Sequence, residues 1–298
     1  MLKKILKNDS FYAFAFIFYS SLLSFKSILV AKKLKLKKLD IKSLKINKNI
    51  YILGSGPSSL LVNDKLIDHE RDTSIGFNFW IYHDYVPDFY FFEIKESNLY
   101  LWYLFCNLLE IKKDEYKNTI FIIKDLENLK VNSAEHLKKI PVSLKNNFYS
   151  CTDFHLGRGS NNRFDLTFNI YNKLWFLHNF YPKCRGSISL CLSFAKALSP
   201  MNIIIAGVDL SDSTFHLARD FISTKYKLPK MNENTKELVK NTRGKGFSHS
   251  SEDGLGGEPI ISYVIKTFAN NFKKHNIKTF TLDNESKLTD FLDVWDHK

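Results

Sequence analysis

The feature that most constrains this sequence is a series of short apolar runs, each ending in small or acidic residues. Residues 50–53 (IYIL) lead into Gly54-Ser55-Gly56-Pro57-Ser58, and residues 203–206 lead into Gly207-Val208-Asp209. Short apolar runs of this kind are typical of buried strands in a parallel sheet, and ligands bind at the carboxyl ends of such strands. The pattern predicts an α/β fold in which these turns converge on one cleft.

Other segments continue the alternation of strands and helices. Strands are predicted near residues 74–79, 89–92, 119–123, 203–205 and 278–282, and helices near 98–110, 187–198 and 260–275. This alternation favours a Rossmann-like, mostly parallel sheet with helices on both faces. The irregular polar stretch at 211–247 is interpreted as a smaller lid or acceptor-binding insertion in a domain spanning residues 49–298.

The stretch from residue 150 to 185 fits no simple pattern. Its polar loop at 157–163 could bind an anionic sugar or phosphate through Arg158 or Arg163, or could be an exposed turn. The four cysteines form no CxxC pair, which predicts reduced core residues and no zinc site. No metalloprotease, nucleophile-elbow or Walker A motif is present, so we expect no metal site and no serine-hydrolase chemistry.

The formal net charge of +12 is concentrated at the N-terminus. Residues 1–50 contain twelve lysines and two aspartates, which leaves a local net charge of +10. A nucleic-acid enzyme would carry its positive charge around a binding groove, so no nucleic-acid partner is expected. Residues 1–48 are instead predicted to be a basic, apolar arm that binds an anionic membrane surface, with a solvated basic linker as the alternative for its lysine-rich part.

The apolar run of this arm leaves its orientation open. Residues 11–25 are free of charge, but fifteen helical residues reach only about 22 Å, short of a hydrocarbon core of roughly 30 Å. The run could be an interfacial anchor, a span extended to Ala31 with Lys26 reaching the surface, or a buried helix of the fold. The lysines that follow it place the main domain on the cytoplasmic side.

Three positions could carry chemistry. The glycine turn at 54–58 could approach a phosphate or ribose, or could be an ordinary strand-to-helix turn. Asp209 could orient a donor or a neighbouring backbone group, or cap a loop. His249, in a polar loop ahead of an apolar helix, could accept a proton from an acceptor hydroxyl. On composition alone its rivals are His83, His155, His178 and His216.

In order and spacing, these motifs resemble the bacterial sialyltransferases of glycosyltransferase family 42. The resemblance runs from about residue 50 to 290, and each match is short. It rests on Gly54-Ser55-Gly56-Pro57-Ser58, Phe77-Asn78-Phe79, the aromatic strand at 89–92, Gly186-Ser187-Ile188-Ser189, Ala206-Gly207-Val208-Asp209, His249-Ser250 and Asn284-Glu285-Ser286.

The resemblance implies an inverting enzyme with His249 as general base, a CMP-activated sugar as donor substrate, and no required metal or cofactor. The donor would be a CMP-linked sialic acid or related ulosonic acid, and the acceptor a cell-surface glycan or glycolipid, such as lipooligosaccharide or capsule. The enzyme would work at the cytoplasmic face of the inner membrane, held peripherally or by one N-terminal anchor. The implied substrate-binding residues are Gly54, Ser55, Gly56, Ser58, Asn78, Ser187, Gly207, Asp209, Ser250 and Ser286.

Two departures from the family pattern leave the donor open. Ser55 replaces the asparagine of the first turn, and residues 210–215 lack the family's tyrosines, for which Ser211, Thr214 or Tyr226 could substitute. The glycine turn and the Gly-Val-Asp strand end are also similar to a domain resembling archaeal pterin pyrophosphokinases, which implies magnesium-dependent ATP chemistry. A third hypothesis is a non-catalytic, membrane-bound scaffold in glycan assembly.

Overall fold

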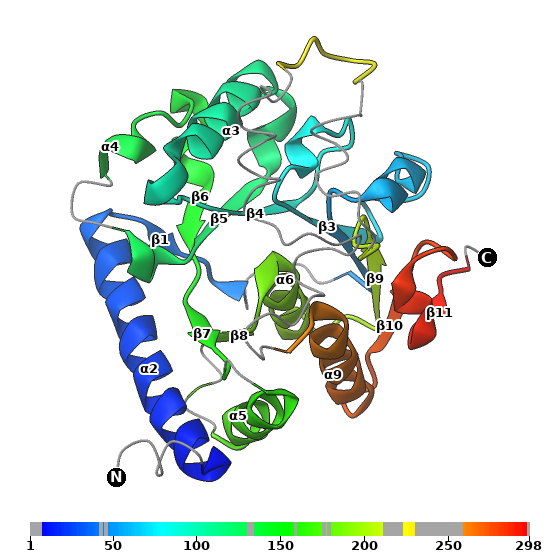
Figure 1. Ribbon diagram of the computed structural model, residues 1–298. Coiled ribbons are helices and arrows are strands. Elements are labelled where there is room, and N and C mark those ends of the chain that lie inside the picture. The colour runs from blue at the N-terminus through cyan, green and yellow to red at the C-terminus, as the bar shows by residue number, and fades with distance from the viewer. Residues whose placement is uncertain are drawn as a thin grey trace.

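The computed structural model describes residues 8–41, 44, 47–129, 134–157, 160–174, 177, 180–210, 223–229 and 259–296. Its centre is a nine-stranded sheet with the order β1-β6-β5-β4-β3-β2-β9-β10-β11, and every neighbouring pair is parallel (Figure 1). The strands of this sheet are β1 (Lys37–Lys38), β2 (Asn49–Leu53), β3 (Asp72–Phe77), β4 (Phe89–Glu93), β5 (Ile120–Lys124), β6 (Phe148–Ser150), β9 (Asn202–Ala206), β10 (Lys278–Thr281) and β11 (Asp293–Val294).

Helices cover both faces of the sheet, as the sequence predicts. Alternate residues of β2 point to opposite sides of the sheet. Ile50 and Ile52 belong to the core between the sheet and helices α6 (Gly186–Ala197) and α9 (Ile261–Lys273). Tyr51 and Leu53 belong to the core between the sheet and helix α3 (Leu99–Ile111). In Figure 1, α3 lies above the sheet and α6 and α9 lie below it. The described α-helices are α2 (Asp9–Lys33), α3 (Leu99–Ile111), α4 (Ala134–Leu137), α5 (Asn161–Lys173), α6 (Gly186–Ala197) and α9 (Ile261–Lys273).

The predicted α/β class and parallel sheet are confirmed. Every strand and helix predicted from the apolar pattern is present, with ends shifted by at most two residues. Of the predicted lid at 211–247, only residues 223–229 are among those described. Their contacts are given with the site below.

The N-terminal arm packs against the rest of the chain. Helix α2 contacts α5, the turn after β5 and strand β7, and β1 pairs with β6 in the main sheet. Asn8 caps the start of α2, since its side chain accepts hydrogen bonds from the amides of Ser10 and Phe11. The described part of the arm is therefore packed against the domain that carries the sheet.

The stretch that fitted no simple pattern forms a small two-stranded sheet and a helix. Strands β7 (Asp153–His155) and β8 (Tyr181–Lys183) pair in parallel, and α5 lies between them in sequence. Arg163 lies on α5, where its guanidinium bonds to Asp9 at 2.9 Å and covers the ring of Tyr12. The sequence left open whether the loop at 157–163 binds an anionic ligand or is an exposed turn, and in the structure Arg163 pairs with a carboxylate of α2. Arg158 lies outside the described residues.

Candidate functional site

The turns after β2 and β9 meet at the carboxyl edge of the sheet, as predicted. The two strands are neighbours, with Leu53 in register with Ala206. The chain continues this pairing beyond both strands, since the amide of Gly54 donates to the carbonyl of Ala206 and that of Gly56 to the carbonyl of Gly207, each at 2.8 Å. We call residues 54–58 and 207–209 the turn pair.

Buried side-chain bonds hold the turn pair together. Asp209 accepts hydrogen bonds from both the amide and the hydroxyl of Ser58, the former at 2.9 Å. The Ser58 hydroxyl accepts in turn from the amide of Gly207 at 2.7 Å. Both side chains are nearly inaccessible to solvent. The sequence left several roles open for Asp209, and in the structure it orients a neighbouring backbone group, the amide of Ser58.

The glycines of the turn pair allow this close approach. Gly207 has a φ of +67°, and a Cβ there would clash with the carbonyl of Gly54. A Cβ on Gly56 would lie 2.6 Å from an oxygen of Asp209. The close contact between the two turns is therefore sufficient to explain why glycine occupies positions 56 and 207. Ser55 lies buried in the first turn, and buried Ser286 caps a short turn with its hydroxyl, which accepts from the amide of Leu288.

Asn78 and Ser187 form a second contact at the same edge. Asn78 follows β3 in a left-handed conformation, with a φ of +55°, and its carbonyl accepts a hydrogen bond from the Tyr90 hydroxyl at 2.7 Å. Its side-chain oxygen accepts from the hydroxyl of Ser187, in the first turn of α6, at 3.0 Å. Residues 109 positions apart in the sequence are thereby joined across the edge.

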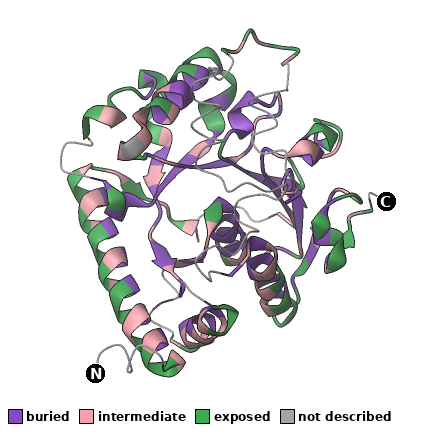
Figure 2. Ribbon diagram, in the orientation of Figure 1, coloured by how far each residue is buried: buried purple, intermediate pink, exposed green. Residues whose placement is uncertain are grey.

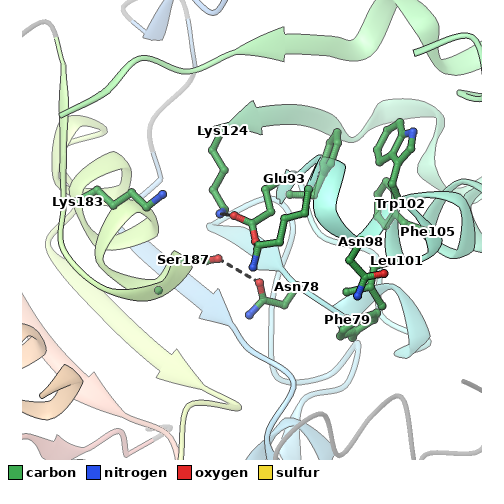
Figure 3. A pocket seen from close by; sticks show the side chains of 13 residues that line it. Asn78, Phe79, Glu93, Asn98, Leu101, Trp102, Phe105, Lys124, Lys183 and Ser187 are labelled. Carbon is green, nitrogen blue, oxygen red and sulfur yellow. Dashed lines mark hydrogen bonds and ion pairs between the residues drawn. The ribbon is translucent and has the colours of Figure 1, made fainter. Parts of the chain in front are cut away.

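These two residues line a pocket of about 320 Å³ between α3 and the start of α6 (Figure 3). Its wall is aromatic on the α3 side and charged on the sheet side. None of the turn-pair residues lines it. The pocket is lined by Asn78, Phe79, Phe92, Glu93, Lys95, Asn98, Leu101, Trp102, Phe105, Lys124, Lys183, Gly186 and Ser187.

A network of ion pairs lies beneath the charged wall. Lys124, at the end of β5, contacts Glu93 and Asp125, each at 2.6 Å. Lys183, at the end of β8, contacts Asp125 and lies 3.5 Å from Asp153. We call these five residues the ion network. In Figure 3 the ammonium group of Lys124 meets the carboxylate of Glu93 at the pocket wall.

The pKa values of the two aspartates in the ion network are shifted in opposite directions. Burial raises the pKa of Asp153 to about 6, although Lys183 favours its charged form. Burial alone would also raise the pKa of Asp125, but the ammonium groups of Lys124 and Lys183 hold it well below its usual range. One oxygen of Asp153 is buried and has no hydrogen-bond partner among the described residues.

Two aspartates of the ion network, together with Glu127 and His155, form a group with metal-ligand spacing. Asp125, Glu127, Asp153 and His155 each offer an atom within 4.8 Å of the others. The ammonium groups of Lys124 and Lys183 contact Asp125, and that of Lys183 also lies near Asp153, so positive charge from the protein already faces these two carboxylates. The arrangement is that of a buried ion-pair network.

Sequence reasoning missed the charged wall. Lys124 and Asp125 directly follow the predicted strand at 119–123, so extending the strand-end argument to charged residues would have found them. Lys183 and Asp153 carry no such signal, because they belong to strands of three residues that the apolar pattern does not reveal.

The predicted general base cannot be placed, because His249 and Ser250 lie outside the described residues, as do His178 and His216. Two rivals are described. His83 is buried beside Lys112. Its burial, and to a smaller extent the positive charge of Lys112, lower the pKa of His83 to about 4. His155 contacts Glu127 at 3.0 Å. Neither lines the pocket.

The described piece of the predicted lid, residues 223–229, contacts the segment that follows β3. Asp84 accepts hydrogen bonds from the hydroxyl of Ser223 and from the amide and hydroxyl of Thr224, and the Tyr82 hydroxyl donates to the carbonyl of Pro229 at 3.0 Å. Tyr226, a suggested replacement for the family's tyrosines, donates its hydroxyl to Glu115 and does not line the pocket.

Comparisons with known proteins give structural matches alone. No protein-family model and no curated protein matches the sequence. The monofunctional alpha-2,3-sialyltransferase Cst-I from Campylobacter jejuni is 16% identical, with 85% of this chain and 83% of that chain covered and a TM-score of 0.46. The sialyltransferase CstII from the same organism, in complex with the substrate analogue CMP-3FNeuAc, is 15% identical, with 83% and 85% covered and a TM-score of 0.43. At these values the matches assign no role to any residue.

Proposed function

We propose that the chain is an inverting glycosyltransferase that moves a sialic acid or related ulosonic acid from its CMP donor to a cell-surface glycan such as lipooligosaccharide or capsule. The observation that carries this proposal is the pocket at the carboxyl edge of the parallel sheet, bridged by Asn78 and Ser187. The resemblance implied that both residues lie around the CMP donor. Ligands of open α/β sheets bind at this edge.

The chemistry of the pocket suits an anionic sugar nucleotide. The lysines of its wall, Lys95, Lys124 and Lys183, favour negatively charged groups, although each is already near a carboxylate. The start of α6 adds the positive end of a helix dipole and the hydroxyl of Ser187. Trp102 and Phe105 offer apolar surface for a base or sugar ring.

The proposed reaction needs one base and a stabilised leaving group. His249 takes the proton of an acceptor hydroxyl, whose oxygen attacks the anomeric carbon on the face opposite CMP. The bond from that carbon to the phosphate oxygen breaks, its electron pair stays with CMP, and the configuration inverts. Hydrogen bonds and positive charge at the pocket stabilise the departing phosphate. The assignment of His249 rests on the sequence resemblance.

Calorimetric titration of the full chain with CMP, CTP and ATP tests the donor class. We expect CMP and CTP to bind, and Ser187→Ala to weaken CMP binding by about tenfold, because a hydrogen bond at the donor site is lost. Binding of ATP with magnesium in place of CMP would support the pyrophosphokinase-like alternative. Binding of no nucleotide would support the scaffold.

A pair of histidine variants tests the proposed base. His249→Ala should retain the affinity for CMP and lose sugar transfer, with a loss of at least about 100-fold. His275→Ala changes a histidine just after α9, away from the carboxyl edge, and should retain both properties. Normal transfer by His249→Ala would overturn the assignment of the base and leave the donor class intact.

A further inference from the structure

Helix α2 has two faces of different character. At three- and four-residue spacing its inner face buries one isoleucine and otherwise alanines and serines against the domain: Ala13, Ile17, Ser20, Ser24, Ser27 and Ala31. The opposite side carries large apolar side chains that are each at least half exposed: Phe11, Phe14, Phe18, Leu22, Phe25 and Leu29. Figure 2 shows this exposed side along the outer edge of the molecule. By length and composition alone, the helix could cross a membrane.

Hydrogen bonds fix the inner face to the domain. The hydroxyl of Ser24 donates to the carbonyl of Asp153 at 2.7 Å, and that of Ser27 donates to the carboxylate of Glu127 at 2.8 Å. At the other end of the helix, Asp9 pairs with Arg163 of α5. Contacts along the helix therefore hold it to α5, to β7 and to the turn after β5.

This attachment opposes a spanning orientation. A spanning α2 would carry α5 and β7 into the hydrocarbon core, together with the polar residues of α5. Charged and polar groups at that depth are costly unless they face a protein interior. A helix that keeps one face on the domain can bury its other face by lying parallel to the membrane surface.

Charge identifies the surface that this face would meet. Six lysines in the same described stretch are exposed, namely Lys26, Lys32, Lys33, Lys35, Lys37 and Lys38, and its two acidic residues are Asp9, which pairs with Arg163, and Asp40. A second copy of the chain would present the same positive stretch, whereas anionic headgroups present the opposite charge. Aromatic side chains are also favoured at the boundary between headgroups and acyl chains.

We propose that α2 is an in-plane membrane anchor, with its outer apolar face in the headgroup and acyl boundary of a bilayer that contains anionic phospholipids. The domain rests on the membrane through this face, and residues 11–31 do not span. The inference does not depend on the transfer chemistry, since it rests on the two faces of the helix and on its attachment to the domain.

Flotation of the full chain with vesicles tests the surface. Binding is expected with phosphatidylcholine vesicles that contain phosphatidylglycerol, and weaker binding when that lipid is omitted. The triple variant Phe14→Ser/Phe18→Ser/Phe25→Ser should lose binding by more than about tenfold and retain the native circular dichroism spectrum. The matched control Leu60→Ser/Val142→Ser/Met201→Ser removes equally exposed apolar side chains elsewhere and should bind as the unchanged protein does.

The depth of labels on α2 in the bilayer distinguishes a helix that lies in the membrane plane from one that spans the membrane. Single cysteines at positions 11, 18, 25 and 29 can carry a fluorophore, because the four native cysteines are buried. An in-plane helix places all four labels at the same shallow depth when quenched by lipids brominated at set positions. Labels that are deepest at the middle of the helix and shallow at its ends would overturn the proposal. So would a lipid-free dimer that fails to bind vesicles and dissociates in the triple variant.

Discussion

The turn pair and the pocket occupy the same edge of the sheet but use their polar groups differently. In the turn pair, Ser58 and Asp209 bond to each other and to backbone amides, and glycines bring two turns into contact. In the pocket, Asn78 and Ser187 bridge two elements above a cavity, and charged side chains line one wall. The residues that define the sequence motif most clearly therefore bond to one another, whereas Asn78 and Ser187 line a cavity.

Because the turn pair is so tightly packed, the largest loss of stability is expected on substitution of one of its glycines. Gly207→Ala should lower the free energy of unfolding by about 4 kcal/mol, because it combines a left-handed backbone with a steric clash against Gly54. Gly186→Ala is the matched control, since Gly186 has a similar φ of +66° but open space around its Cβ. It should lower the unfolding free energy by only about 1–2 kcal/mol in urea denaturation. Equal losses would contradict tight contact in the turn pair.

An intermediate effect is expected in the ion network, where stability should depend on pH. Asp153 has a raised pKa, so its contribution to stability is fully present below pH 3.8 and is lost as the pH rises through about 6. Asp153→Asn should therefore raise the free energy of unfolding at pH 7.5 by about 2 kcal/mol, and this gain should vanish toward pH 4.

The neighbouring Asp125 provides the control of opposite sign. Its depressed pKa gives stability that is present above pH 3.8 and is lost as the pH falls through the lower, folded value. Asp125→Asn should therefore destabilise the protein at pH 7.5, because Lys124 and Lys183 each lose a partner. Unfolding curves measured from pH 4 to 8 give both signs. The same sign for both variants would contradict the assignment of the two carboxylates.

The smallest effect is expected at the pocket residue Asn78. Asn78→Gly keeps the left-handed backbone and removes the amide, so the unfolding free energy should fall by less than about 1 kcal/mol. Asn78→Ala removes the same amide and adds backbone strain of about 1 kcal/mol. Both variants should weaken CMP binding by a similar factor of about three to ten, as measured by calorimetry. If only the alanine variant loses affinity, Asn78 acts through backbone shape and not through its amide.

The sheet could be predicted because its strands are short apolar runs with abrupt polar ends. That signal located β2, β3, β4, β5, β9 and β10, and the same reasoning brought the turns at residues 54 and 207 together. It fails for β7 and β8, which have three residues each, and β8 contains a proline. Local periodicity is too weak in such segments to reveal pairing that depends on the rest of the fold.

The site could be predicted only in part for a related reason. Asn78 and Ser187 were identified through the order of the motifs, and the structure joins them. Lys183 enters the pocket through β8, so no pattern near it in the sequence indicates its role. For α2, a buried helix was one of the alternatives, but its inner face was not identified, although Ser20, Ser24 and Ser27 recur at helical spacing within the apolar run.

The pairing of β1 with β6 has a practical consequence for producing the protein. A common way to improve solubility is to delete an apolar N-terminal segment, here residues 1–48. That deletion would expose the backbone of β6 along an unpaired sheet edge, which invites aggregation. It would also leave the carbonyl of Asp153 and the carboxylate of Glu127 without their serine donors. Recombinant work should therefore keep the arm and add detergent or lipid during purification.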